Sequence, residues 1–332
     1  MESGFYSASG SQPPEFFSPF SKNNQSRVKQ VWAVGGGKGG VGKSLIASNL
    51  AISLSRLGNE VITIDLDLGG ANLHTALGID LPQQTLSDFI KERSPSLNQC
   101  VVPTGIPHLS MISGAQDSMD IVSLSSTEKE RLVQNLKLLD ADYVVLDLGA
   151  GTNFNTLDFF IMSDTGLIAL LPEPTSIENA YRFIKGAYYR RLKMNPHLAK
   201  IHPLIEAASD AKNSMGIRTP SDLFREANRL DPEIAMRLKL EITKFQPRLI
   251  VNQARTQADI DIGSSVKTVC KRYFGIEIQY VGYLDYDPAA WQAVRRKRPL
   301  MLEFPNSKLA LNLEKITQQL IKQHSPGSIS FL

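Results

Sequence analysis

The stretch GGGKGGVGKS, residues 35–44, decides the fold of this chain. It contains the pattern G-x-x-x-x-G-K-[ST], in which backbone N–H groups surround phosphates, the lysine contacts the β/γ oxygens and the hydroxyl binds Mg²⁺. The positions of the pattern are Gly37, Gly42, Lys43 and Ser44. Lys38 is one cation more than the pattern requires. The stretch therefore predicts a site for a nucleoside triphosphate and Mg²⁺, with an additional positive charge.

Apolar runs on both sides of the loop predict how it is held. Residues 30–34 have the pattern of a buried strand, and residues 43–57 carry apolar side chains at helical spacing before Gly58. Further strands are predicted at residues 61–65, 108–113, 143–147, 166–171, 248–252 and 277–284. Most of these runs are continuously apolar, which is typical of parallel strands covered on both faces. Because helices such as 127–139 and 176–192 fall between them, the predicted fold class is α/β, a doubly wound and mostly parallel P-loop NTPase sheet.

The remaining segments are assigned by composition. The predicted divisions are an N-terminal arm at 1–27, a phosphate-loop domain at 28–323, a helical insertion at about 196–245 and a tail at 324–332. The arm is polar, contains prolines and lacks periodicity, so we expect it to be disordered. The insertion is charged and carries helical spacing without strand signals. Thr175 and Glu178 predict a capping box at the start of the helix 176–192.

Composition and charge narrow the function classes. The chain has 332 residues, and its 36 Lys and Arg against 33 Asp and Glu give a net charge of +3, too small to indicate nucleic-acid binding by itself. Two basic clusters, 190–193 and 295–298, can contact phosphates or anionic lipid, or form solvated helix faces. Cys100 and Cys270 are too far apart to indicate a disulfide framework or a zinc site. Without a long apolar run or an apolar signal segment, we expect a cytoplasmic protein.

Three aspartates stand at the predicted ends of strands. The strand 143–147 ends in Asp147, where P-loop enzymes place the carboxylate that holds Mg²⁺. Asp65 and Asp67 follow the strand after the loop's helix, so one can help to organise the metal and the other can orient an attacking water. Helix caps or solvated loop acids would explain any one of the three. Together, beside a phosphate loop, they favour catalysis of phosphoryl transfer to water.

The motifs KGGVGKS, DLDLGGANL and VVLDLGAG together resemble the deviant Walker A ATPases of the MinD/ParA type, over residues 28–323. In that family the early lysine reaches across a two-fold interface to the phosphates of the partner's ATP. The resemblance therefore implies an ATP-dependent homodimer and a catalytic role for Lys38. It also implies that Asp67 positions the hydrolytic water, and that Ser44, Asp65 and Asp147 surround Mg²⁺. Nucleotide contacts are implied at Gly37, Lys38, Gly39, Gly40, Val41, Gly42, Lys43, Ser44 and Leu45.

The same resemblance assigns the base of the nucleotide. Asn252 in LIVNQAR matches the asparagine that contacts adenine. Asp287 lies in YLDYDPAAWQAVRRKRP, which matches the segment that closes over the base. The chain lacks the N-K-x-D guanine motif, which fits adenine.

Within the family, PEPTSIENAYRFIK, YDPAAWQAVRRKRP and FPNSKLALNL look most like the FlhG group, MinD-like ATPases that control flagellar number and placement. The resemblance implies a protein partner, such as an FlhF-like GTPase or a flagellar component. It leaves open a peripheral attachment to the inner face of the plasma membrane. The alternative is a ParA-like protein whose ATP dimer binds DNA nonspecifically through clusters 190–193 and 295–298. A metal-cluster carrier of the Mrp type shares the fold but normally needs a cysteine pair.

Overall fold

The computed structural model describes residues 30–68, 70–114, 124–210 and 215–324. The predicted N-terminal arm, 1–27, and all of the predicted tail except His324 lie outside these ranges. Among the described residues, none of the helices combines the length and the apolar character needed to cross a membrane.

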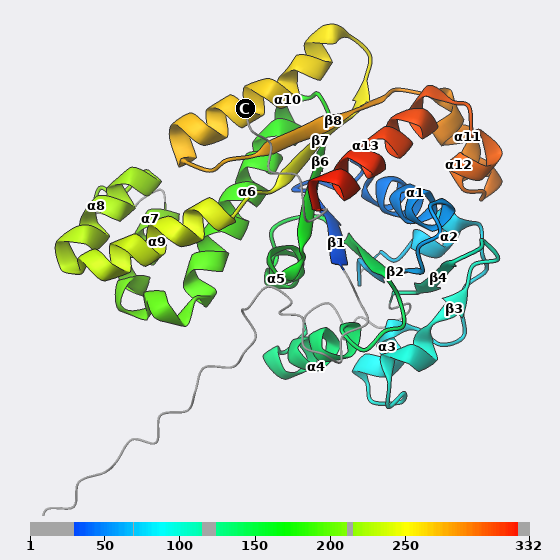
Figure 1. Ribbon diagram of the computed structural model, residues 1–332, viewed down its shortest axis with the longest axis horizontal. Helices are drawn as coiled ribbons and strands as arrows, with labels where there is room; N and C mark the ends of the chain where they lie inside the picture. The colour runs from blue at the N-terminus through cyan, green and yellow to red at the C-terminus, as the bar shows by residue number, and fades with distance from the viewer. Residues whose placement is uncertain (1–29, 69, 115–123, 211–214, 325–332) are drawn as a thin grey trace, which may run out of the picture.

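The centre of the molecule is an eight-stranded sheet (Figure 1). Its strands are β1 (Gln30–Gly35), β2 (Val61–Leu66), β3 (Val102–Pro103), β4 (Leu109–Ile112), β5 (Tyr143–Leu148), β6 (Thr165–Leu170), β7 (Arg248–Ala254) and β8 (Gln279–Asp285). They lie in the order β3-β4-β2-β5-β1-β6-β7-β8, and every neighbouring pair is parallel except β3 with β4. The predicted α/β class with a mostly parallel sheet is confirmed. The two-residue strand β3 was not predicted, because it is too short to carry a pattern.

Helices cover both faces of the sheet, and each face has its own apolar core. One face is covered by α1 (Lys43–Arg56), α2 (Leu73–Leu77), α11 (Pro288–Arg296), α12 (Leu300–Glu303) and α13 (Lys308–His324). The other is covered by α3 (Leu86–Ile90), α4 (Ser126–Leu136), α5 (Phe154–Met162), α6 (Pro174–Met194) and α10 (Gln257–Val269). Successive strand residues alternate between the cores: Val31 and Ala33 face one, and Trp32 and Val34 the other. This explains why the strands read as continuous apolar runs.

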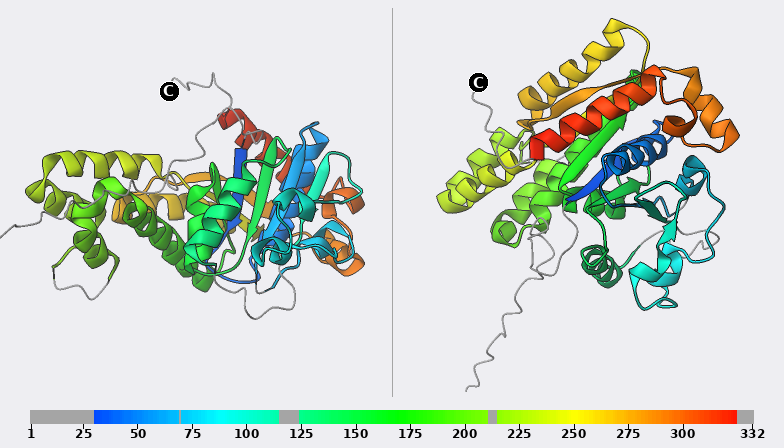
Figure 2. Two further views of the ribbon diagram at one scale, coloured as in Figure 1. Left: turned by 90° about the horizontal axis from the view of Figure 1, so that it is seen from below. Right: turned by 45° about the vertical axis from the view of Figure 1, so that its right-hand side comes forward.

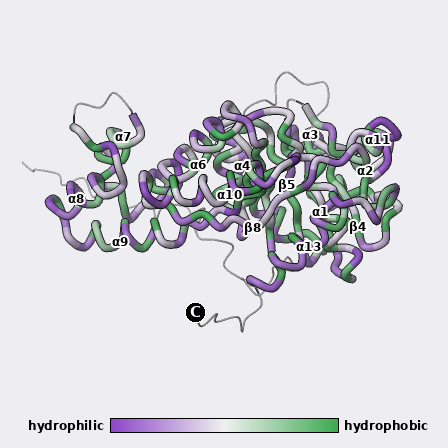
Figure 3. The backbone as a smooth tube through the Cα atoms, turned by 90° about the horizontal axis from the view of Figure 1, so that it is seen from above, coloured by the Kyte–Doolittle hydropathy of each residue, from purple (hydrophilic) through white to green (hydrophobic). Residues whose placement is uncertain are grey.

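The segment expected to be a helical insertion forms η4 (Pro196–Ile201), α7 (His202–Ser209), α8 (Pro220–Leu230) and α9 (Pro232–Lys244). These helices project at the end of the molecule opposite α11, as Figures 1 and 2 show, and Figure 3 shows hydrophilic and hydrophobic residues alternating along α8 and α9. Their buried side chains, such as Leu223 and Leu238, extend the core that α6 covers.

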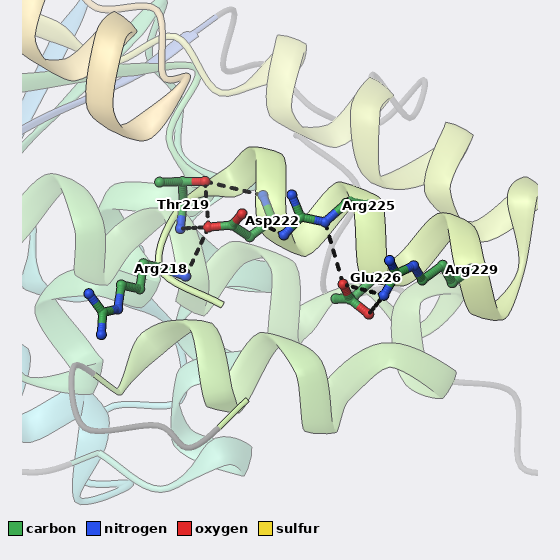
Figure 4. Close-up of polar contacts among 6 residues, drawn as sticks. All are labelled: Arg218, Thr219, Asp222, Arg225, Glu226 and Arg229. Carbon is green, nitrogen blue, oxygen red and sulfur yellow. Dashed lines mark hydrogen bonds and ion pairs between the residues drawn. The ribbon is translucent and has the colours of Figure 1, made fainter. Parts of the chain in front are cut away.

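The outer surface of α8 is neutralised by its own side chains (Figure 4). Thr219 and Asp222 form a capping box, in which each backbone N–H donates to the other's side chain. Arg225 donates to Asp222 at 2.8 Å, and Arg229 donates to Glu226 at 3.1 Å. Every cation of this ladder therefore has a carboxylate within one helical turn.

The start of α6 differs from the prediction. The helix begins at Pro174, with Glu173 as N-cap and no capping box, so the predicted pairing of Thr175 with Glu178 is wrong. Proline has no N–H to satisfy and its fixed φ suits the first helical position, so the helix starts earlier than the apolar pattern indicates. Glu178 pairs instead with Arg182 at 2.5 Å. The Thr175 hydroxyl is left for Lys38, whose Nζ donates to it at 3.3 Å.

Candidate functional site

The predicted phosphate-binding residues, 37–45, form the loop between β1 and α1 and the first turn of α1. Gly40 and Gly42 have φ of 76° and 91°, conformations in which side chains are strained. Gly42 is the N-cap of α1, and no side chain caps the helix. The N–H groups of the first turn are therefore directed at a ligand, and the helix dipole favours an anion there.

The loop is packed closely against β6 and α6. A Cβ on Gly37 would lie 2.0 Å from the backbone oxygen of Asn179 in α6, so that position accepts glycine alone. At Gly36 a Cβ would lie 2.9 Å from the oxygen of Ala169 in β6. Gly39, in contrast, has open space around it. The loop is thus held on one side by the fold and faces outward at its tip.

Asn252, the predicted adenine contact, lies at the end of β7 and is buried against the loop. Its Nδ2 donates to the backbone oxygen of Val41 at 2.8 Å, and its Oδ1 accepts from the N–H of Gln253 at 2.9 Å. A Cβ on Gly42 would lie 2.4 Å from the same Nδ2. Asn252 therefore fixes the shape of the phosphate loop, a role that the sequence did not indicate because its contact partner is 211 residues away.

Asp147 and Asp65 are register partners at the ends of the neighbouring strands β5 and β2. Asp147 is 1% exposed, and neither of its carboxylate oxygens has a hydrogen bond of regular geometry from another described residue, although the Ser44 hydroxyl lies nearby. Burial raises its pKa well above the usual value, and the charge of Asp65 raises it further; the Ser44 hydroxyl and the Lys43 ammonium oppose the rise. The side chains of Lys43, Ser44, Asp65 and Asp147 therefore lie close enough to interact electrostatically.

The donors around Asp147 fit Mg²⁺. A buried carboxylate with unsatisfied oxygens, beside the Ser44 hydroxyl, is the hard oxygen chemistry that this ion prefers. No group of three or more His, Cys, Asp or Glu side chains among the described residues is arranged to hold a metal. Mg²⁺ is usually bound through one or two carboxylates together with phosphate oxygens and water.

Asp65, predicted as a metal ligand, has a second set of partners. Its Oδ1 accepts from the N–H of Asp67 and its Oδ2 from the N–H of Leu73, both at 3.0 Å. Burial raises its pKa to about 6, although these N–H groups lower it. Because the two bonds join both ends of the segment 67–73 to one carboxylate, Asp65 positions the segment that carries Asp67.

Asp67 is partly exposed and lies over the backbone that follows β5. A Cβ on Gly149 would be 3.2 Å from its Oδ1. Two residues further, the N–H of Gly151 donates to the oxygen of Gly36 at 3.2 Å, which joins this backbone to the phosphate loop. The structure thus brings Asp67, Asp147 and the loop together at one edge of the sheet.

Lys38 and Asp287 have other surroundings. Besides Thr175, the Nζ of Lys38 has the carboxylate of Glu173 at 3.6 Å, and the side chain is 40% exposed at the start of α6. Both partners lie in the stretch PEPT, residues 172–175, and no local pattern in the sequence connects this stretch with Lys38. The Asp287 carboxylate accepts from the N–H of Ala289 at 2.9 Å and caps α11. It follows β8, the strand next to β7, which contains Asn252.

Comparison with known proteins decides the family. A family model described as ParA, NUBPL iron-transfer P-loop NTPase, matches residues 27–191. The chain belongs to the ParA/MinD family of P-loop NTPases. The antiactivator FleN of Pseudomonas aeruginosa is 28% identical over 88% of this chain and 86% of FleN. The flagellum site-determining protein YlxH of Helicobacter pylori is 35% identical over 52% of this chain and 56% of YlxH.

The fold of this chain is also similar to that of solved structures in the ParA/MinD family. The septum site-determining protein MinD of Pyrococcus horikoshii, complexed with Mg-ADP, has a TM-score of 0.60 at 18% identity, covering 89% of this chain and 97% of MinD. As a member of the ParA/MinD family, the chain is an ATPase that binds ATP with Mg²⁺. The predicted family, activity and cofactors are confirmed. Cys100 and Cys270 are free thiols buried in the core, so they do not form the surface pair of a metal-cluster carrier.

Proposed function

We propose that this ATPase is a MinD/FlhG-like switch that forms a face-to-face dimer with ATP and is reset by slow hydrolysis. The observation that carries the proposal is the position of Lys38. It is a second cation in the phosphate loop, yet its ammonium lies at the surface against Glu173 and Thr175. The proposed ATPase domain covers residues 28–323, with the helical insertion at about 196–245.

The charge distribution of the loop supports a role for Lys38 in a pair of subunits. Lys43 is buried beside Asp147 and Ser44, so it serves the phosphates of its own subunit. A further cation stabilises a triphosphate most where water is excluded, because the local dielectric is then low. Closure of a second subunit over the nucleotide creates that environment for an exposed lysine. The proposed role of Lys38 is to cross to the partner's phosphates.

The proposed reaction is in-line hydrolysis of the γ-phosphate. Mg²⁺, when bound, neutralises negative charge on the phosphates. Ser44 and Asp147 are the side chains that would hold it, with Asp65 beside them. Asp67 orients the attacking water from the segment that Asp65 fixes, and the loop N–H groups bind the phosphate oxygens. The proposed base contacts are Asn252, near the end of β7, and Asp287, two residues after the adjacent strand β8.

The test is the molar mass of three variants in Mg·ATP, measured by light scattering after size exclusion. We expect Asp67→Ala to be a dimer, because ATP persists when hydrolysis slows by about a hundredfold or more. Lys38→Ala should remain a monomer that still binds ATP, whereas Lys43→Ala should lose both properties. Lys239→Ala, at an exposed lysine of α9, is the control. A monomeric Asp67→Ala protein at saturating ATP would overturn the proposal.

The relatives' names support the proposed process. FleN is named an antiactivator and YlxH a flagellum site-determining protein. We propose that this chain controls the placement or number of a cellular structure such as the flagellum, with an FlhF-like GTPase or a flagellar component as partner. The proposed location is the cytoplasm, with reversible recruitment to the inner face of the plasma membrane. Proteins that co-purify with the Asp67→Ala dimer, and not with Lys38→Ala, would identify the partner.

The alternative, a ParA-like DNA-binding dimer, has less support from the basic clusters. In 190–193, Arg190 pairs with Asp158, and Arg191 and Lys193 pair with Glu241 and Glu206. That cluster is therefore engaged within the protein. The cluster 295–298 is exposed and needs a separate explanation.

A further inference from the structure

The surface around α11 combines exposed apolar side chains with unusually dense positive charge. Trp291 is 62% exposed and Val294 is 53% exposed, one helical turn apart on the same face. Leu302 of the adjoining α12 is 45% exposed. The four residues 295–298 are all cationic and exposed. We call Trp291, Val294, Leu302 and residues 295–298 the α11 surface.

The charges of the α11 surface are only partly matched. Arg296 and Arg298 share the carboxylate of Glu303, at 2.5 Å and 3.6 Å. Glu303 is the one acidic residue between Pro288 and Glu303, so four cations face one anion and the segment has a net charge of +3. The α8 surface is the contrast, because there each arginine has its own carboxylate. A merely solvated helix face would resemble α8.

Arg295 is arranged together with Trp291. Its guanidinium lies 5.2 Å from the centroid of the indole ring. The stacking keeps an aromatic ring and a cation on one exposed face, with Val294 beside them. The favourable position of cations at the C-terminal end of a helix explains why basic residues occur here. It does not explain why Trp291 and Val294 are exposed next to them.

We propose that the α11 surface docks on an anionic lipid bilayer. Tryptophan is favoured at the membrane interface, where its ring is apolar and its N–H stays hydrated. Arginine side chains can lie along the apolar layer while their charges reach lipid phosphates. Duplex DNA would use the cations but would gain little from exposed Trp291 and Val294, since phosphate contacts are polar. The combination therefore favours lipid over nucleic acid.

The α11 surface adjoins the segment that carries the catalytic aspartate. α2 begins at Leu73, whose N–H donates to Asp65, and ends at Leu77, with Gly78 as its C-cap. A Cβ on Gly78 would lie 2.6 Å from the backbone oxygen of Lys297. One short helix thus separates the phosphate site from the docking surface. The proposal rests on the proposed function in one respect, the recruitment to a membrane, and deepens it by assigning the face that binds lipid; it does not depend on the dimer.

The experiment is co-sedimentation of the full chain with vesicles, in Mg·ATP. Vesicles of phosphatidylcholine with phosphatidylglycerol are compared with vesicles of phosphatidylcholine alone. The test variant is Trp291→Ser with Arg295→Glu. The matched control is Met236→Ser with Lys239→Glu on the exposed side of α9, which makes the same change in charge and also removes an exposed apolar side chain. Circular dichroism and melting confirm that both fold.

We expect the wild-type chain and the control to sediment with the anionic vesicles, and binding to weaken at high salt. Because each unit of charge changes affinity for an anionic surface about fivefold, Arg295→Glu alone should weaken binding about 25-fold. Absence of wild-type binding to anionic vesicles, or equal binding by the test variant, would overturn the proposal. DNA retention lost in the test variant, without vesicle binding, would reassign the surface to nucleic acid. Light scattering of the test variant in Mg·ATP shows whether it still forms a dimer. A loss of vesicle binding in a dimeric variant is therefore distinguished from a failure of the proposed dimerisation.

Discussion

Asn252 offers the sharpest test of how the site is built, because the family resemblance and the structure give it different roles. As an adenine contact, it would matter only for ligands with a base. As the donor to Val41 O, it holds the phosphate loop whatever the ligand is. Asn252→Ala combined with two ligands, ATP and inorganic triphosphate, distinguishes the two roles.

The expected size follows from the burial of the bond. Val41 is 1% exposed, so removal of the amide leaves a buried carbonyl without its donor. Such a loss costs about 1–3 kcal/mol, which corresponds to about 5- to 150-fold in an equilibrium constant. If the loop must recover its shape to bind, most of that cost appears in the affinity for phosphates. Both ATP and triphosphate should therefore weaken by similar factors.

Isothermal titration with Mg²⁺ present measures both affinities on one preparation. Gln253→Ala is the matched control, because Gln253 is the next residue in the chain and its side chain is exposed. Its backbone has a φ of 59°, and the substitution does not introduce a glycine there. We expect the control to bind both ligands as the wild type does. If the affinity for ATP falls and the affinity for triphosphate does not change, Asn252 does not hold the phosphate loop through Val41. The adenine contact would then be the role of Asn252.

Three further predictions address the loop, the buried charges and pH. Gly37→Ala should abolish ATP binding because its Cβ meets Asn179 O, whereas Gly39→Ala, in open space, should bind normally; titration showing equal affinity would contradict this. Asp158→Asn should lower the free energy of urea unfolding by about 3–5 kcal/mol, because Lys129 stays buried and unneutralised, and adding Lys129→Met should restore part of it. No restoration would contradict the pairing. Without nucleotide, Asp65 binds a proton more tightly in the folded protein, where its pKa is about 6, than in the unfolded chain, where it is 3.8. Protonated Asp65 therefore contributes fully to the free energy of unfolding below pH 3.8, and this contribution is lost as the pH rises through 6. The wild-type stability relative to Asp65→Asn should therefore fall by about 2 kcal/mol from pH 4 to pH 7, and a constant difference would be the contrary result.

The fold could be predicted from sequence because the patterns that indicate it each lie within a short stretch of the chain. The strands 30–34 and 143–147 are continuously apolar over residues 31–34 and 144–146, and each predicted range ends within a residue of the observed β1 and β5. The phosphate loop has a spacing that is meaningful by itself. The first residue of a helix is harder to predict. Thr175 has the spacing from Glu178 that a capping box needs, but α6 begins one residue earlier, at Pro174.

The parts that could not be predicted depend on distant contacts. The cluster 190–193 looked like a solvated basic face, yet Arg190 binds the buried carboxylate of Asp158 at 2.7 Å. The available signal was Asp158 itself, the one acidic residue of the helix FNTLDFFIM, with apolar residues on both sides of it. Its partner Lys129 lies on α4, and no local pattern connects the two. The double role of Asp65 is hidden in the same way, since its bond to Leu73 depends on how the segment folds back.

The ion group of the buried Asp158 and Lys129 with the partly exposed Arg190 also lies between the nucleotide site and the helical insertion. Asp158 lies on α5, which follows the backbone beside Asp67, and its two cations come from α4 and α6. α6 in turn is joined to α9 by Arg191 and Glu241 at 3.2 Å. Because Asp158 is buried, separating it from its cations would be costly, so these ion pairs stabilise the present arrangement of α5 against α4 and α6. Ion pairs as well as the apolar core therefore form a continuous set of contacts from α5 to the projecting helices.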